Sequence, residues 1–496
     1  MTMRHLVHVA VAALLAGALL GCAVRTPYQR PSVALPTQWQ GQADAAPEVA
    51  PDAPAAVASA VTSSTAPAPV TLAWDQWWPA FGSDELNRLA DAAVAGNHEL
   101  AAAQHRVAQA RALVAATRAT LAPRLDARAD SARTYRSGSS TEALHELGVA
   151  ASFDPDLSGA NRNAVDAAIG RVRQREYARE SLGATLLVEL CEQYFRALSA
   201  SDRLAIARAN IANAESLLSL LVSRQQAGAL SGLEVLRQQG LLASHRATVP
   251  ALEQQRKSAL AAVAVLTGQA PQGFGSHATS LTALRLPSLA TVLPTELIER
   301  HPDVRQAEAE LTVAHADLST ARSAWQPRLR FGARAGVESA TLAGLFNGAT
   351  LVGGLGASLL APLFDGDAIR SHLSAATSRQ DEVISLYHHA VLAALRDVED
   401  RLTALRGFSA QAEQQQRVVD FARNALDMAD LRYRNGATDY ATVLDAQRVL
   451  LAAQDTQALI HLARYSQTLG LVRALGAGVP PAQPVAGLAL SNAAKP

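Results

Sequence analysis

Apolar residues along much of this chain return at steps of three and four positions, which is the spacing of one face of an α-helix. The step is clear in the segment from Leu186 to Leu198. No proline lies between Pro155 and Pro250, or between Pro362 and Pro480. The pattern therefore predicts helices far longer than the ~11 residues that are usual in globular proteins, including one from about Asn163 to Gln226.

Two Pro-Arg-Leu segments interrupt the helical pattern, and an alternation with a period of two follows each. Residues 125–130 alternate between Leu or Ala and a charged residue, and residues 328–335 alternate between Arg or Gly and an apolar residue. Such alternation predicts strands with one apolar and one polar face. A stretch rich in Gly, Ser and Thr and then a second strand follow each segment. The expected strands cover about 124–134, 146–154, 328–338 and 351–361.

The chain contains an internal repeat. A shift of 208 positions places Arg224–Gly268 on Arg432–Gly476 with eleven of the forty-five positions identical, and a shift of 204 places residues 119–125 on 323–329. Repetition at a fixed period indicates duplication of one structural unit, here a long helical hairpin with two strands. The expected organisation is a first repeat over 74–270, a linker over 271–296, a second repeat over 297–478 and a flexible tail over 479–496.

The N-terminus has the pattern of an export signal. Arg4 precedes an apolar run from Leu6 to Leu20, and the run ends in Leu19-Leu20-Gly21-Cys22. That ending resembles a bacterial lipobox, so residues 1–21 are expected to be a lipoprotein signal peptide and Cys22 to carry acyl chains such as palmitate. The alternative is an ordinary secretory signal followed by an incidental cysteine. Residues 22–73, rich in Ala and Pro beyond Ala43, are expected to be an extended tether.

Composition and charge exclude several classes of protein. The formal net charge is +0 without a long run of Lys or Arg, which argues against a nucleic-acid partner. His98-Glu99 lacks the second histidine of a zinc-protease helix, and His388 and His389 are adjacent and so point to different helix faces. No nucleophile elbow or phosphate-binding loop occurs in the sequence. We therefore expect no enzyme, no catalytic residue, no metal and no cofactor, and Cys191 is interpreted as a small core residue.

The strands bear on the assembly of the chain. No segment after the signal offers about 18 uninterrupted apolar residues, so a membrane could be crossed only by strands. Four strands cannot close on themselves, and open edges are not tolerated in hydrocarbon. If the strands face lipid, other chains must complete the sheet. The alternative is a pair of soluble hairpins packed on the helices.

Several motifs resemble one family, the outer-membrane factors of tripartite efflux and secretion systems, and specifically its lipoprotein branch serving resistance-nodulation-division (RND) pumps. The resemblance covers nearly the whole mature chain. The family usually has Arg-Pro-Asp where this chain has His301-Pro302-Asp303, which still suits a helix start. The other matching segments are Tyr28-x-Arg30-Pro31, Pro36-x-x-Trp39, Trp77-Trp78-x-x-Phe81-x-x-Asp84-x-Leu86 and Asn97-x-x-Leu100.

The resemblance implies a mainly α, TolC-like fold with a small β part. It implies a homotrimer with a twelve-stranded β-barrel in contact with outer-membrane lipid and a long α-helical tunnel in the periplasm. The implied function is passive conduction of drugs or other small toxic compounds, received from a periplasmic membrane-fusion adaptor and an inner-membrane RND pump. Two alternatives are an outer-membrane factor for type I protein secretion and a periplasmic adaptor or scaffold lipoprotein.

Two helix-breaking segments, Gly228–Gly232 and Asn435–Asp439, predict the tips of the helical hairpins. By resemblance the tips face the adaptor, and Asp445 stands at an acidic ring that narrows the tunnel, beside Ala441 and Thr442. The alternative for Asp445 is an exposed helix carboxylate near a tip. Pro250 is expected to kink or restart the first return helix. The expected adaptor-facing residues are Gly228, Ser231, Gly232, Gly436, Asp439 and Tyr440.

Overall fold

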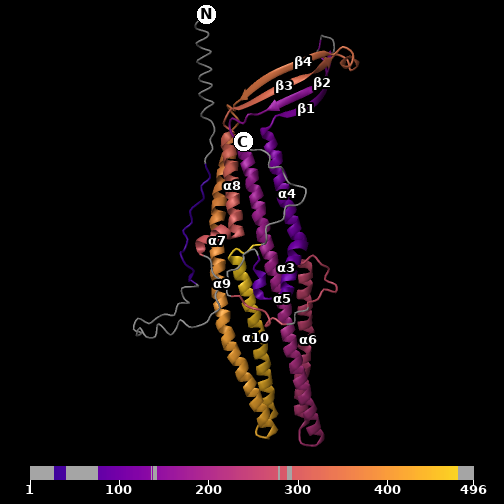
Figure 1. Cartoon of the computed structure of the whole chain (residues 1–496), viewed down its shortest axis with the longest axis vertical. Coiled ribbons are helices and arrows are strands. Elements are labelled where there is room, and N and C mark those ends of the chain that lie inside the picture. The colour runs from indigo at the N-terminus through magenta and orange to yellow at the C-terminus, as the bar shows by residue number, and fades with distance from the viewer. Residues whose placement is uncertain are drawn as a thin grey trace, which may run out of the picture. The chain divides into compact units, whose positions relative to one another are not determined.

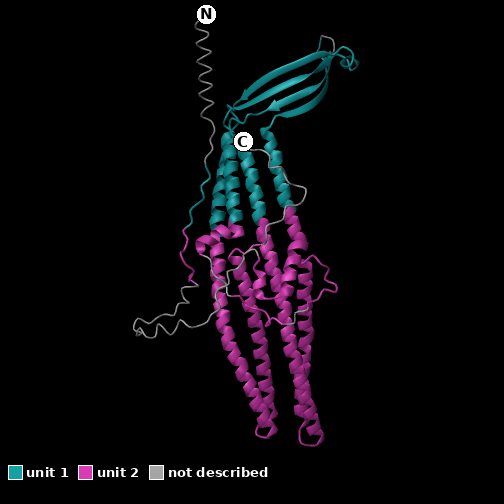
Figure 2. Cartoon of the chain, viewed as in Figure 1, with its two compact units in different colours: residues 1–33, 105–177, 305–390 teal, residues 34–104, 178–304, 391–496 magenta. Residues whose placement is uncertain are grey.

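The computed structural model describes residues 27–40, 76–135, 137, 142–276, 280–287 and 293–478 (Figure 1). The expected signal peptide, Cys22, most of the Ala/Pro-rich segment and the C-terminal tail lie outside these residues. The chain divides into two compact units (Figure 2). Unit 1 comprises 1–33, 105–177 and 305–390, and unit 2 comprises 34–104, 178–304 and 391–496.

Long helices dominate the described residues. Two of them, α5 and α9, have 67 residues each, which confirms the prediction from the proline-free runs. Helix α6 continues through Pro250, so the helix does not restart there. Within the described residues no helix has both the length and the apolar character needed to cross a membrane. The helices are η2 (Trp78–Phe81), α3 (Asp84–Gly96), α4 (His98–Arg118), η3 (Ala119–Leu121), α5 (Ala160–Gln226), α6 (Gly232–Leu266), α7 (Pro294–Arg300), α8 (Pro302–Ser323), η4 (Ala343–Leu345), α9 (Ala368–Arg434) and α10 (Tyr440–Ala474).

Unit 1 holds one four-stranded antiparallel sheet with the order β1-β2-β3-β4. Three of the four expected strands lie within one residue of their predicted bounds, and β2 begins at residue 142 instead of about 146. Each strand pairs with its neighbour in sequence, so the two predicted hairpins also pair with each other through β2 and β3. The strands are β1 (Arg124–Thr134), β2 (Glu142–Phe153), β3 (Arg328–Ser339) and β4 (Thr350–Leu360).

The register of the sheet separates an apolar face from a polar one. One row across the strands consists of Leu125, Ala151, Ala333 and Leu355. Because side chains alternate between faces, the next two rows on this side, up to Ala129, Leu147, Val337 and Leu351, are apolar or glycine as well, and polar residues follow only near the turns, in the row of Ser131, His145 and Ser339. On this face Leu355 is 92% exposed in the single chain. An apolar face of this kind needs a covering that the single chain does not supply.

Parts of the segment over residues 27–40, which follows the expected anchor, pack against helices. In unit 1, Arg30 forms an ion pair with Glu308 at 2.8 Å and donates from Nε to the hydroxyl of Tyr387 at 3.1 Å. Burial, aided by the charge of Glu308, raises the pKa of Tyr28 to about 12. In unit 2, Trp39 is only 2% exposed. The Tyr28–Pro31 and Pro36–Trp39 motifs are therefore points of attachment within the segment expected to be a tether.

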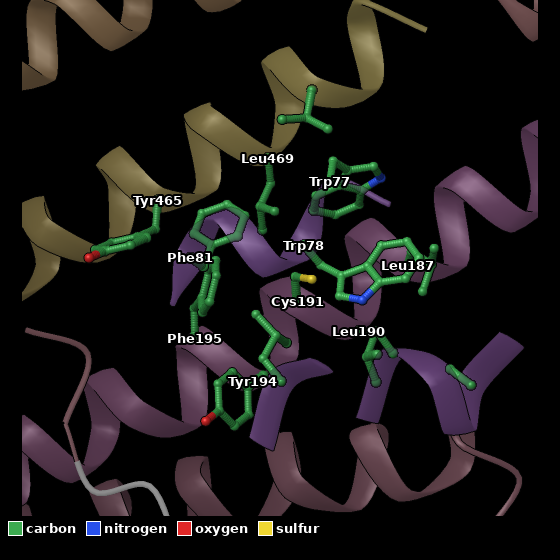
Figure 3. Close-up of a cluster of buried hydrophobic side chains, with 14 of the residues drawn as sticks. Trp77, Trp78, Phe81, Leu187, Leu190, Cys191, Tyr194, Phe195, Tyr465 and Leu469 are labelled. Atoms are coloured by element: carbon green, nitrogen blue, oxygen red, sulfur yellow. The ribbon is translucent and has the colours of Figure 1, made fainter. Parts of the chain in front are cut away.

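The core of unit 2 is built around aromatic rings (Figure 3). The ring of Phe195 lies 5.1 Å from that of Phe81 and 5.2 Å from that of Tyr465, measured between centroids. Cys191 is fully buried in this cluster, and burial raises the pKa of its thiol far above the usual value. Few aromatic residues occur in the chain, but η2, α5 and α10 bring several of them to this one cluster, where each buries a large apolar area.

Residues related by the 204-residue shift begin α4 and α8. Asn97 accepts from the backbone N–H groups of Glu99 and Leu100 at 2.9 and 3.0 Å, which caps the start of α4. At the related position, Nδ1 of His301 accepts from the backbone N–H of Asp303 at 3.3 Å. A neutral imidazole thus takes part in the cap, which explains how histidine is accommodated at this helix start.

We predict that His301→Gln weakens the dependence of unfolding on pH. His301 is 8% exposed, and burial lowers its pKa below the ordinary 6.5, against the raising effects of Asp303 and Asp397 and with a further lowering by Arg473. As the pH falls through 6.5, the unfolded chain takes up a proton before the native histidine does, so stability decreases. Melting temperatures from circular dichroism at pH 7.5 and 5.5 should differ less for the variant than for the wild type. An identical difference in both proteins would contradict the assignment.

Candidate functional site at the hairpin tips

The first tip connects α5 to α6 in unit 2. Gly228 has a φ of 73°, a left-handed conformation that favours glycine, and the N–H of Ala229 donates to the carbonyl of Arg224 at 3.0 Å. Both the N–H and the hydroxyl of Ser231 donate to the carboxylate of Glu234, at 3.0 and 2.8 Å. These bonds end one helix and begin the next within a few residues, which holds the turn in a defined shape.

The second tip connects α9 to α10 and repeats this arrangement. Gly436 has a φ of 72°, and the N–H of Ala437 donates to the carbonyl of Arg432 at 2.8 Å. The carboxylate of Asp439 accepts from the hydroxyl and the N–H of Thr442, at 2.7 and 3.1 Å, and so caps α10. These two bonds, together with the charge of Arg237, lower the pKa of Asp439, which keeps the cap ionised at neutral pH.

A buried contact joins the two tips. The hydroxyl of Tyr440 donates to Oε1 of Gln238, and Nε2 of Gln238 donates to the carbonyl of Ala214 at 2.8 Å. Gln238 is 0% and Tyr440 2% exposed. The first residue of α10 is therefore bonded through α6 to α5. Apolar side chains of both hairpins surround the contact, namely Leu221, Val235, Leu241, Ala429, Tyr433, Val443 and Leu444.

A groove of about 1140 Å³ runs beside this contact in unit 2, between α6 and α10 and with part of α5. Asp445 and Ala441 line it, and the guanidinium of Arg448 lies 3.7 Å from the carboxylate of Asp445. The side chain of Asp445 is 75% exposed. Arg203 closes another part of the groove with two bonds to Asp455, at 2.6 and 3.0 Å.

The structure thus brings Ala441 and Asp445 to one groove, whereas the hydroxyl of Thr442 donates to Asp439 at the start of α10. Of the expected tip residues, Tyr440 is buried and contributes packing between the hairpins. The other five are exposed, together with Leu233 and Leu236 of the first tip, which are 56% and 66% exposed. Exposed leucines beside polar turn residues suit contact with another protein. The five exposed tip residues are Gly228, Ser231, Gly232, Gly436 and Asp439.

Gln238 is not among the site residues predicted from the sequence, although the internal repeat contains a signal that indicates it. Under the 208-residue shift Gln238 corresponds to Ala446, and Tyr440 corresponds to Gly232. The repeat therefore departs from itself at both partners of the buried bond. The described residues contain no group of three His, Cys, Asp or Glu side chains placed to hold a metal ion.

A family model and related sequences match nearly the whole described part of the chain. The family model of the outer membrane efflux protein matches residues 89–269 and 293–477. The pyoverdine export outer membrane protein OpmQ of Pseudomonas aeruginosa is 35% identical over 415 residues, covering 81% of this chain and 87% of OpmQ. The outer membrane protein OprJ of the same species is 29% identical over 485 residues, covering 94% of this chain and 95% of OprJ.

Solved structures share the fold. The outer-membrane channel OprN superimposes with a TM-score of 0.81 at 25% identity, covering 92% of this chain and 99% of OprN. The open state of the MtrE outer membrane channel of Neisseria gonorrhoeae gives 0.79 at 23% identity, with 92% and 99% coverage. Both are channels, and the described residues of this chain place the same mixture of long helices and a small sheet in one polypeptide.

Proposed function

Because this chain belongs to the outer membrane efflux protein family and is an outer-membrane efflux channel, we propose that three copies form one conduit. The observation that carries the proposal is the sheet. Its apolar face is exposed in the single chain, with Leu351 at 82% and Leu355 at 92%, and β1 and β4 are its two edges. Three chains with four strands each would supply twelve strands, pair every edge and turn the apolar face to lipid.

The names of related proteins indicate which compounds this chain exports. Members of the family are channels. The name of OpmQ refers to pyoverdine export, and that of TtgI, a Pseudomonas putida protein 27% identical to this chain, refers to toluene efflux. We assign to this chain drugs or other small toxic compounds. An inner-membrane pump would supply them through a periplasmic adaptor, and the exposed residues of the two tips would meet that adaptor. Passage through such a conduit requires no covalent chemistry.

The anchor completes the proposal. Acyl chains on Cys22 would hold the start of the mature chain at the membrane, and the packed motifs at Tyr28–Pro31 and Pro36–Trp39 would attach the following segment to the helices. Radiolabelled palmitate should enter the wild-type protein and not Cys22→Ser. Equal labelling of both proteins would exclude this cysteine as the site.

The gate is proposed to form where Asp445 of each chain meets its two copies. Three carboxylates around one axis attract cations, so they would favour cation passage. The buried bond from Tyr440 to Gln238 fixes the start of α10 only five positions before Asp445, which supports a defined position for the carboxylate. Arg448 lies 3.7 Å from this carboxylate, and since both side chains are largely exposed, solvent screens the attraction between them.

Asp445→Asn tests the conduit and its gate together. In planar bilayers under a KCl gradient, purified wild-type protein should conduct, and the variant should shift the reversal potential toward anions. Asp420→Asn, on the exposed surface of α9, is the matched control and should leave the potential unchanged. Absence of any conductance would count against the conduit, whereas conductance with an unshifted potential would remove Asp445 from the gate.

A further inference from the structure

The polar face of the sheet in unit 1 carries a cluster of arginines that the proposed function does not use. The register of the strands brings these arginines to one face, because the even-numbered residues of β1, β2 and β3 lie in common rows. The cluster, which we call the arginine belt, consists of Arg124 and Arg128 of β1 and Arg328, Arg330 and Arg334 of β3.

Charge is segregated along β3. The belt occupies the rows nearest the helices, where Asp126 is the only acidic side chain among the described residues of this face. The next row toward the turns contains Asp130, Glu146 and Glu338 in register. On β3 the polar face therefore has a basic part that ends at Glu338, whereas on β1 acidic residues alternate with Arg124 and Arg128 and partly neutralise them.

The arginines of β3 have no acidic partner. Arg124 bonds to Asp126 at 2.8 Å, and Arg128 approaches Asp130 at 3.7 Å. Arg328, Arg330 and Arg334 form no ion pair with any described residue, and all three are exposed. Like charges this close on one strand repel each other, so the arrangement gains stability when an anion lies between them.

Glycines leave the guanidinium groups uncovered. The register places Gly354 in the row of Arg334, and a Cβ atom at Gly354 would lie 3.6 Å from Nε of that arginine. Gly332 and Gly356 form a neighbouring row, and a Cβ atom at Gly356 would meet nothing within 4 Å. Around Arg334 the neighbouring positions on β4 are thus glycines, which leaves this part of the belt open to a ligand from the polar side.

We propose that the arginine belt is a binding site for soluble organic anions that carry two or more carboxylate, sulfonate or phosphate groups. Alternate residues of a strand are about 6.8 Å apart, so the belt offers guanidinium groups at several spacings to one multiply charged molecule. The inference rests on the proposed function, because a sheet whose apolar face meets lipid turns this polar face to the conduit. The belt would favour anionic cargo in the part of the conduit formed by the strands.

Pyranine, a fluorescent pyrene trisulfonate, tests the belt. Its fluorescence anisotropy should rise with the full-length protein in a non-ionic detergent, and added salt should reverse the rise by screening. The triple variant with Arg328→Gln, Arg330→Gln and Arg334→Gln should bind pyranine with an affinity reduced by about tenfold or more, because three attractive charges are lost. The matched control is Arg133→Gln on β1, whose register partner is Ala143 on the opposite face, and its affinity should stay at the wild-type value.

The possible outcomes separate the belt from the conduit. Equal pyranine affinity in the wild type and the triple variant overturns the belt, whether or not the proteins conduct in planar bilayers. If pyranine binding depends on the arginines but the protein does not conduct in planar bilayers, the belt is supported and the conduit is not. In lipid nanodiscs the affinity should be the same with phosphatidylglycerol as with phosphatidylcholine. Loss of binding only in phosphatidylglycerol would mean that lipid headgroups occupy the arginines, which overturns the assignment to soluble anions.

Discussion

Gly336→Val is expected to abolish the heat-labile trimer that the wild-type protein should show on unheated gels. A Cβ atom at Gly336 would lie 2.7 Å from the carbonyl oxygen of Leu147 and 2.8 Å from Cα of Gly148. Both atoms belong to the backbone of β2, so no side-chain rotation can relieve the contact. Gly148 and Gly336 are register partners, and this is the pairing that joins the two hairpins of the chain.

The magnitude follows from the number of copies. Overpacking typically costs about 1–3 kcal/mol, and a conduit of three chains would contain the contact three times. Since about 1.4 kcal/mol is a factor of ten in an equilibrium, we expect the trimer to fall by at least tenfold. Valine has a higher strand propensity than glycine, so in the absence of the contact the same change would strengthen the strand.

Gly356→Val provides the matched control. This glycine lies on the same face of the neighbouring strand β4, and an added Cβ atom would meet nothing within 4 Å. The control should assemble at least as well as the wild type. Equal loss of the trimer in both variants would show that any valine on the polar face prevents assembly, independently of the backbone contact at Gly336. Full assembly of Gly336→Val would contradict the register of β2 and β3.

Much of the fold could be predicted from the sequence, because local periodicity determines the long helices and the amphipathic strands. Helix α5 ends at Gln226, and β1 spans Arg124–Thr134, as the periodicity and the Pro-Arg-Leu segment predicted. The predicted start of β2 was less accurate. Glu142 extends β2 because it pairs with Thr134 of β1, and such pairing is not encoded in the alternating pattern of a single segment. Pro250 was expected to kink or restart α6, yet the helix does not restart.

The candidate site could be predicted only in part. Glycine and capping residues fixed the positions of both turns, because their conformations are local. The contact between Tyr440 and Gln238 joins residues 202 positions apart, and no local rule pairs them. Likewise, the alternating pattern showed arginines on one face of β3, but the register was needed to place Arg124 and Arg128 in the same cluster.

Loss of the chain is expected to have the largest effect in the cell. In the proposed assembly every turnover of the pump would require a conduit through the outer membrane, because the pump and adaptor alone would not deliver a compound to the exterior. Retention of exported compounds should therefore rise in cells that lack this chain, even when the pump remains. Cells that carry Gly336→Val should resemble the deletion, whereas cells that carry Gly356→Val should resemble the wild type, because only the first change places a Cβ atom against the neighbouring backbone.

Retention is therefore the measurement that tests efflux most directly. The bacterium that encodes this chain, its deletion strain and the complemented strain would be loaded with a panel of drugs, dyes and phenolic acids, and the retained amount of each compound would be measured over time. If the chain is an efflux conduit, at least one compound should be retained more in the deletion strain, and complementation should restore wild-type retention. Unchanged retention of every compound in the panel would contradict that function.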